Sequence, residues 1–482
     1  MNKFILTIGF LFSIFLFTTN AGALETSDLS GDKTLKLTVD EAVDLALKNN
    51  LGLESERLKL EQKKWAMYTS WNPLIPSTKL SFSLARLNER KSISATVPFD
   101  NPMDPMDTAS IPDVGTMYSN VLKTDPIDMP EWGASLSFDT TFVLNAYIVF
   151  SIYNSVLDYN SGKINIEIAE KKIERDVRKN YYNLLLIRQN TELLKESVKA
   201  AENRYNQAVA NYKNGLVPEY TMLAAQVAYE NMKPAVLEIE NGYFLAALSF
   251  KQTLGLKSEV ELNFVNGMDT PVVREFNCDE LIEKYIDNRL DVQSLYRSMN
   301  ILKNVRNITI ASMTPTFMFR ASVDPTFQKD AGKDAWFGDS TYMNDNWKQN
   351  SGMLMFSFSL PLDYYFPFSS KQMDLVNNNY QLKQTEIAMR QLKNGAELEI
   401  KSLVLKLQKS INSLNTLRMT YELAQKTYNL AEIAYKAGSK ELLEVQNSEL
   451  EYKKAKNNIL QEEYNYTTAL LDLEYALNTK LR

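Results

Sequence analysis

The chain contains one sequence unit twice, and this duplication limits the folds open to it. The segment 40–51, which begins Asp-Glu-Ala-Val-Asp, matches the segment 279–290 at a constant shift of 239 positions. A second pair of segments, 212–254 and 435–477, matches at a shift of 223 positions. Because the shift falls from 239 to 223, the first half carries sixteen extra residues, which we assign to the Pro- and Asp-rich segment 85–131. The sequence therefore predicts two copies of one structural design.

Each copy is expected to contain one very long helix. Apolar residues and tyrosines recur at alternating steps of four and three in both copies, at Leu194, Val198, Ala201, Tyr205, Ala208 and Tyr212, and at Leu417, Tyr421, Ala424, Tyr428, Ala431 and Tyr435. This period of about 3.5 residues is typical of a coiled-coil seam. We expect the long helices at 148–213 and 369–436, each about 100 Å long at 1.5 Å per residue.

The two repeats, at 24–270 and 271–482, should share one order of elements. That order is a helix, a strand, a loop, a second strand, the long helix, a tight turn and a last helix. The shorter helices are expected at 38–70 and 219–255 in the first repeat, and at 279–312 and 440–479 in the second. The loops are expected at 85–131 and 324–350. The fold class is α+β, mostly α.

Four segments alternate apolar and polar side chains, as two-faced strands do. They are 79–84, 135–142, 317–323 and 354–360. The pattern fits a membrane-spanning sheet, and it also fits a soluble sheet with one wet face. In lipid every backbone polar group must be paired, so strands there belong to a closed barrel, which four strands cannot close. Three chains would supply twelve strands, a number found in such barrels.

The N-terminus is interpreted as a secretory signal. Lys3 is followed by an apolar run over 4–17, which is shorter than the roughly 20 residues a spanning helix needs. A polar stretch then ends in Ala21-Gly22-Ala23, the small-x-small pattern of a cleavage site. We expect residues 1–23 to be a signal peptide that is removed.

Composition excludes several kinds of chemistry. The chain has no histidine and only one cysteine, Cys278, so His-based catalytic triads and intrachain disulfides are impossible. We therefore expect no enzyme, no metal site and no cofactor. The formal net charge of -6 argues against a nucleic-acid partner. Adjacent carboxylates such as Glu462 and Glu463 are expected on solvated helix faces.

These features together resemble the TolC-type outer-membrane efflux proteins, also called outer membrane factors. The resemblance rests on the opening helix from Asp40 to Asn50, the duplication, the Tyr-x-x-Gly turns at Gly215 and Gly438, and the residues Gln226 and Glu449, eleven positions after each turn glycine. It covers nearly the whole mature chain. It implies a homotrimer with a 12-stranded transmembrane β-barrel in the outer-membrane lipid and a coiled-coil α-barrel that spans the periplasm.

The resemblance also implies function and partners. A channel-tunnel of this kind passively exports small molecules such as drugs and metabolites, or proteins in type I secretion. It would contact a periplasmic adaptor, or membrane fusion protein, and through it an inner-membrane pump of the RND or ABC type. The open alternative is a periplasmic coiled-coil scaffold without a pore.

The site residues are placed by the family pattern. The resemblance puts a periplasmic gate at Tyr435, Lys440, Glu444 and Asn447, with Thr221 at the corresponding place in the first repeat. Lys440 stands where the family has arginine, Glu444 replaces aspartate and Asn447 lacks the second charge, so we expect weaker block by cations. The plainer interpretation is that Glu444 only complements the helix dipole.

The helix turns are the second predicted site. Contact with the adaptor is expected at Gly215, Leu216, Val217 and Pro218 in the first turn, and at Gly438 and Ser439 in the second. Both glycines suit a backbone with positive φ at a helix end. An ordinary helical hairpin explains the same residues without any adaptor.

Overall fold

The computed structural model describes residues 34–86, 96–98, 121–123, 132–265, 276–324, 326–329 and 352–481. The predicted signal peptide at 1–23 and most of the predicted loops at 85–131 and 324–350 lie outside these residues. The chain divides into two compact units, Met1–Lys48 with Asn180–Asp269, and Asn49–Lys179 with Thr270–Arg482. The division into two sequence repeats stays a prediction.

The first unit joins the two ends of the first repeat through a short parallel ladder. Strand β1 (Thr34–Leu37) pairs with β6 (Glu261–Phe264). Neither strand was predicted, because a four-residue strand is too short to show a clear alternation. Helix α2 (Val39–Asn49) follows β1 at once, and a capping box starts it: the Thr38 amide donates to Glu41 Oε2 at 2.8 Å, and the Glu41 amide donates to Thr38 Oγ1 at 3.3 Å.

An aromatic cluster forms the core of this unit. The Tyr181 ring meets the Phe264 ring edge-on, with centroids 5.0 Å apart, and lies 6.4 Å from the Phe250 ring. Its buried hydroxyl donates to the Leu37 carbonyl at 3.0 Å. The end of α4 (Ala146–Lys213) then pairs with α5 (Glu219–Thr253) along a seam of small buried residues, Ala201, Ala208 and Ala225.

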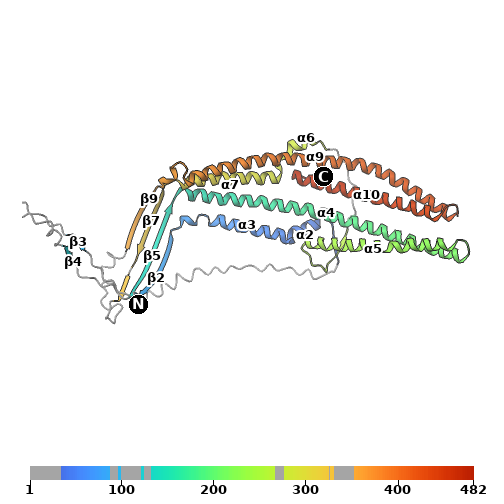
Figure 1. The fold of residues 1–482 in the computed structure, drawn as a ribbon, viewed down its shortest axis with the longest axis horizontal. Helices are drawn as coiled ribbons and strands as arrows, with labels where there is room; N and C mark the ends of the chain where they lie inside the picture. The colour runs from blue at the N-terminus through green and yellow to red at the C-terminus, as the bar shows by residue number, and fades with distance from the viewer. Residues whose placement is uncertain are drawn as a thin grey trace, which may run out of the picture. The chain divides into compact units, whose positions relative to one another are not determined.

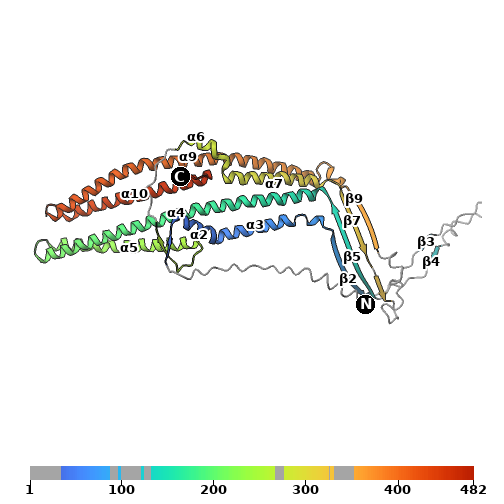
Figure 2. The ribbon, with the colours of Figure 1, turned by 180° about the vertical axis from the view of Figure 1, so that it is seen from behind.

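The second unit contains one antiparallel sheet of four long strands. Its order is β2 (Ser77–Arg86), β5 (Trp132–Leu144), β7 (Thr316–Val323) and β9 (Gly352–Ser359), and they lie side by side in Figures 1 and 2. The short strand β8 (Thr326–Lys329) continues the pairing with β5, and β3 (Thr96–Pro98) pairs separately with β4 (Val121–Lys123). The four long strands cover the four predicted segments except Leu360, which follows β9, and they extend beyond most of the other ends.

The two faces of this sheet differ in chemistry. Residues directly opposite each other share a face, so the pairs Leu80–Phe138 and Phe319–Phe356 lie on one side, and Lys79–Asp139 and Ser83–Ser135 lie on the other. The apolar face is exposed, with 38 to 77% of each side chain accessible at Leu80, Phe82, Leu84, Leu136, Phe138, Leu144, Phe317, Phe319, Val323, Leu354, Phe356 and Phe358. No element of this chain covers it among the described residues. The edge strands β2 and β9 each have one side that pairs with no strand of the described part of the chain.

Helices lie beyond one end of this sheet, where β2 and β7 begin and β5 and β9 end (Figure 1). They are α3 (Leu51–Thr69), the first part of α4, α6 (Cys278–Tyr285), α7 (Leu290–Ser312), α9 (Ser370–Lys436) and α10 (Leu442–Leu477), with short 3-10 turns η1 (Asn72–Leu74), η2 (Ile286–Asn288) and η3 (Leu362–Tyr365). A core of aliphatic residues joins α9 to α10: Ile400, Val404, Leu407 and Leu414 pack with Tyr466, Ala469, Leu473 and Leu477. Within the described ranges no helix is both long enough and apolar enough to cross a membrane. The mostly helical α+β class with long paired helices is confirmed.

The structure differs from the predicted helices in two places. The predicted helix 38–70 breaks at Asn50, whose side chain accepts from the Leu53 amide at 3.1 Å and caps α3. The predicted helix 279–312 breaks at Arg289, an extended residue between η2 and α7. Neither break contains glycine or proline, so the usual breaker signals are missing.

Glu463 was wrongly expected to be solvated. Its side chain is buried between α10 and α9, where Arg418 Nη2 approaches Glu463 Oε1 to 3.7 Å. Burial raises the pKa of this carboxyl above its ordinary value of 4.5, although Arg418 partly opposes the shift. The neighbouring Glu462 accepts a short hydrogen bond from the Ser410 hydroxyl.

Candidate functional site

Two helical hairpins end in turns with the same backbone geometry. In the first turn Gly215 has φ +72°, and its amide donates to the Tyr212 carbonyl at 2.9 Å. The next amide, of Leu216, reaches back to the Asn211 carbonyl at 2.9 Å. Together these bonds form a Schellman motif, which satisfies the last carbonyls of α4. The left-handed φ explains why glycine occupies this position.

The second turn repeats this motif at the shift of 223. Gly438 has φ +74°, and its amide donates to the Tyr435 carbonyl at 2.9 Å. The Ser439 amide donates to the Ala434 carbonyl at 2.9 Å, and the Ser439 hydroxyl donates to the same carbonyl at 3.0 Å. The duplication seen in the sequence therefore extends to individual hydrogen bonds.

The helices after the turns also begin alike. Pro218 is the N-cap of α5, and the Thr221 amide donates to its carbonyl at 3.1 Å. Glu441 is the N-cap of α10, and the Glu444 amide donates to its carbonyl at 3.1 Å. Thr221 and Glu444 thus occupy equivalent positions in their own hairpins, and only the second hairpin places a carboxylate there.

The structure joins two of the predicted gate residues. Lys440 Nζ and Glu444 Oε1 form a short ion pair four residues apart, with about half of each side chain exposed at 48% and 51%. Asn447 lies one turn further along the same exposed side of α10, while Leu442 and Val445 face α9 and are buried. Tyr435 is half-buried near the end of α9. Glu444 is also in the first turn of α10, where a negative charge complements the helix dipole.

The two tips differ in polarity. Leu216 is 71% exposed, next to the half-buried Val217 and the exposed Pro218, so the first tip is apolar. Gly438 and Ser439 give the second tip a small and polar surface. The roles assigned to both tips and to the gate residues stay predictions.

A stacked tyrosine pair clamps each hairpin above its turn. In the first hairpin Tyr205 stacks on Tyr229, with centroids 6.2 Å apart and planes 12° from parallel. In the second hairpin Tyr428 stacks on Tyr452 at 5.6 Å and 7°. Glu449, one turn of α10 before Tyr452, is only 4% exposed and forms a short ion pair with Lys453. Its position was noted in the sequence, but its burial was not expected, because an isolated glutamate at a seam position gives no signal of its partner.

A charged group on the polar face of the sheet was also missed. Asp139 Oδ1 accepts from Arg320 Nε at 3.1 Å and from Arg320 Nη2 at 2.5 Å. Lys79 lies directly opposite Asp139 in the strand register. The alternation of β2, β5 and β7 already places all three residues on one face, so this signal was available in the sequence.

Comparisons with known proteins agree with this geometry. Residues 398–479, in α9 and α10, match the family described as outer membrane efflux protein. No curated protein sequence matches the chain. The resemblance stated from the sequence is thereby confirmed for the segment that the family covers.

Solved structures match nearly the whole chain. The Campylobacter jejuni CmeC outer membrane channel is 14% identical, with 91% of this chain and 85% of that chain covered and a TM-score of 0.69. The Vibrio cholerae outer membrane protein VceC is 12% identical, covering 92% and 97% with a TM-score of 0.68. The open state of the Neisseria gonorrhoeae MtrE outer membrane channel is 14% identical, covering 92% and 89% with a TM-score of 0.67. The chain therefore has the fold of these outer-membrane proteins, and its C-terminal helix pair carries the sequence pattern of the outer membrane efflux protein family.

Proposed function

We propose that the protein is a trimeric outer-membrane channel that passively exports solutes. The observation that carries the proposal is the exposed apolar face of the four-stranded sheet, from Leu80 on β2 to Phe356 on β9. A soluble protein rarely leaves so many neighbouring large apolar side chains in water. Lipid would cover this face, and the polar face with Lys79, Asp139 and Arg320 would line the lumen.

The open edges of the sheet set the stoichiometry. Among the described residues, β2 and β9 each have one side without a partner strand, and unpaired backbone groups are costly in lipid. Pairing β9 of one copy with β2 of the next would remove both edges. Three copies would close a barrel of twelve strands, wide enough for a lumen, whereas the eight strands of two copies leave an interior that side chains fill.

We place the gate at the second hairpin turn. Three copies would bring three Glu444 carboxylates to a narrow axis, where they attract cations and repel one another. The ion pair with Lys440 neutralises much of each charge. Asn447 adds no second ring, and Thr221 adds no charge from the first hairpin. This arrangement supports weak cation block compared with a gate of two bare carboxylate rings.

The partners and cargo are proposed on the same basis. The exposed tips at Leu216 and Ser439 suit contact with a periplasmic adaptor, which would connect the channel to an inner-membrane pump of the RND or ABC type. Such a complex would export drugs or metabolites, or proteins in type I secretion. The scaffold alternative, a periplasmic coiled coil with a soluble sheet, is disfavoured because it leaves the apolar face of the sheet in water.

Two measurements test the channel. Purified protein from detergent-extracted outer membranes is expected to run as a trimer and to conduct in a planar bilayer. Glu444→Ala is expected to weaken block by divalent cations. The matched control is Glu432→Ala, which removes a carboxylate with the same i,i+4 ion pair, to Lys436 at 2.9 Å, on the other helix of the hairpin. Protein that is folded and trimeric but carries no current would favour the scaffold. A pore that divalent cations block equally in both variants would support the channel but would contradict a gate at Glu444.

A further inference from the structure

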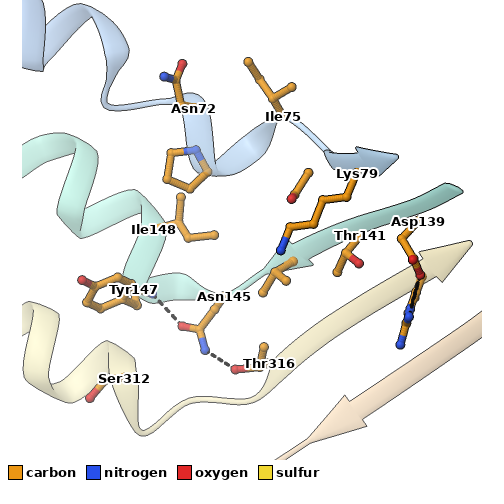
Figure 3. A pocket seen from close by; sticks show the side chains of 14 residues that line it. Asn72, Ile75, Lys79, Asp139, Thr141, Asn145, Tyr147, Ile148, Ser312 and Thr316 are labelled. Carbon is orange, nitrogen blue, oxygen red and sulfur yellow. Dashed lines mark hydrogen bonds and ion pairs between the residues drawn. The ribbon is translucent and has the colours of Figure 1, made fainter. Parts of the chain in front are cut away.

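A cavity of about 880 Å³ opens where the sheet meets the helices. Figure 3 shows its walls: η1 with Asn72 and Ile75, the start of α4 with Tyr147 and Ile148, and the polar face of β2, β5 and β7. The cavity belongs entirely to the second unit. The 67 residues of α9 lead from this end of the unit to the second turn, about 100 Å away at 1.5 Å per residue, so the cavity is separate from the proposed gate.

The cavity contains one cation without a counter-ion. Lys79 is directly opposite Asp139 in the register, but the Asp139 carboxylate turns away and binds Arg320 at 2.5 and 3.1 Å. In the part of the chain that the structure describes, the Lys79 ammonium has no hydrogen bond or ion pair. Figure 3 shows its side chain leading away from Asp139, into the space between β2 and α4. Lys79, Arg320 and Asp139 together therefore carry one net positive charge in each copy of the chain.

The other walls are largely apolar, with a few hydroxyl groups. Pro73 and Ile75 at η1, Ile148 on α4 and Val143 on β5 supply hydrocarbon surface. Thr141 and Thr316 add hydroxyls near the sheet, and Thr316 also accepts from Asn145 Nδ2 at 2.5 Å. Small-molecule sites typically have a volume of roughly 300 to 1,000 Å³ and combine apolar walls with a few placed polar groups.

These observations fix the chemistry of a fitting ligand. The apolar walls favour a hydrocarbon body, since burying it releases water. The lysine favours one anionic group, because a compact ammonium pairs readily with a carboxylate. A neutral hydrocarbon would leave the ammonium without a counter-ion, and an inorganic anion would leave the apolar walls wet.

We propose that this cavity binds an organic anion with an apolar body, such as an aromatic carboxylate, on the luminal side of the channel. The proposal rests on the proposed function for its luminal position and names a class of solute that the channel passes. Three copies bring three such sites, with their Lys79 ammonium groups, to one level of the lumen.

Benzoate is the probe, and benzamide is its neutral counterpart. In single-channel recordings benzoate is expected to cause brief current interruptions in the wild type, and benzamide is not. Lys79→Gln should raise the half-blocking concentration of benzoate at least tenfold, and Lys79→Arg should restore most of the block. The control is Lys64→Gln on α3, an exposed lysine outside the cavity whose ammonium lies 5.9 Å from the Tyr68 ring, and it should leave the block unchanged.

Calorimetric titration of the detergent-solubilised protein repeats the comparison without needing a pore. Benzoate heat that disappears in Lys79→Gln supports the site even if no current is found, and in that case only the proposed channel fails. If benzoate blocks the wild type and Lys79→Gln at the same concentration and binds both with the same heat, the proposed site is wrong. A pore that still conducts would in that case leave the proposed channel function supported. Benzamide that binds as well as benzoate would also overturn it. Circular dichroism of each variant confirms that the helices are intact.

Discussion

Four glycine-to-alanine substitutions test the backbone geometry of the hairpins. Gly215 and Gly438 have φ values of +72° and +74° at the turns, whereas Gly242 and Gly395 lie inside α5 and α9. A Cβ atom built at any of the four positions meets nothing within 4 Å. Packing therefore does not distinguish the four substitutions, and only backbone conformation does.

The expected effects have opposite signs. Alanine in the left-handed region costs about 1 to 2 kcal/mol, because its Cβ approaches the following carbonyl. Alanine inside a helix gains about 1 kcal/mol over glycine, which loses more backbone entropy. The same chemical change should therefore weaken the two turns and strengthen the two helices.

Hydrogen exchange with mass spectrometry measures these changes locally in the purified protein. At Gly438→Ala, the Ser439 amide, bonded to Ala434 at 2.9 Å, should exchange roughly five to thirty times faster. Gly395→Ala should slow exchange in its stretch of α9 by about fivefold at most. Unchanged or slower exchange at the Gly438→Ala turn, with Gly395→Ala behaving as expected, would refute a left-handed glycine at this turn.

Three further predictions concern single side chains. Lys440→Gln should lower the concentration of divalent cation that half-blocks the pore, because it leaves the Glu444 carboxylate without its ion pair. It should change the free energy of unfolding by less than about 0.5 kcal/mol, since the pair is exposed. Lys436→Gln is the control, and an equal half-blocking concentration in both variants would contradict the role of the Lys440–Glu444 pair. Tyr181→Phe should lower the free energy of unfolding, measured by chemical denaturation, by about 1 kcal/mol, because it removes the buried hydroxyl that donates to the Leu37 carbonyl. That carbonyl keeps a hydrogen bond from the Val265 amide at 3.2 Å. Tyr182→Phe should change the free energy of unfolding little, and a similar loss in both variants would argue against the Tyr181 hydrogen bond. Burial raises the pKa of Glu463, so the contribution of this carboxyl to stability is present below pH 4.5, the ordinary pKa, and is lost as the pH rises through the raised pKa. Glu463→Gln should therefore have a higher melting temperature than the wild type at pH 8 and the same melting temperature at pH 4. A difference in melting temperature that does not depend on pH would be inconsistent with the raised pKa.

The regular elements of the fold were predictable because their periodicity is long. The seam from Leu194 to Tyr212 spans many turns, and the structure has α4 at Ala146–Lys213 against a predicted 148–213. The breaks at Asn50 and Arg289 were missed because a cap, and not a glycine or proline, ends the helix at Asn50, and Arg289 stands in extended backbone. The β1–β6 ladder was missed because its pairing joins strands at opposite ends of the first repeat.

The candidate site was predictable only where its residues are close in the sequence. Lys440 and Glu444 are four residues apart beside a helix start, and this spacing is enough to predict an ion pair. The cavity around Lys79 is assembled from three separate segments, so its volume and the choice of Asp139 between Lys79 and Arg320 depend on the packed structure. The burial of Glu463 has the same origin, since the general tendency of glutamate to be exposed gave the wrong prediction.

The parallel ladder of β1 and β6 has a consequence for the order in which the chain folds. Thr34 pairs with Glu261 and Leu37 pairs with Phe264, so β1, the first of the described strands, has no partner in this ladder until more than two hundred further residues have been synthesised. Closing such a long loop is slow, and an unpaired edge is open to wrong pairings in the meantime. The capping box at Thr38 and Glu41 is local and can form at once, which starts α2 before its strand is paired. Strand β1 therefore stays without its partner until the first hairpin, formed by α4 and α5, and then β6 have been synthesised.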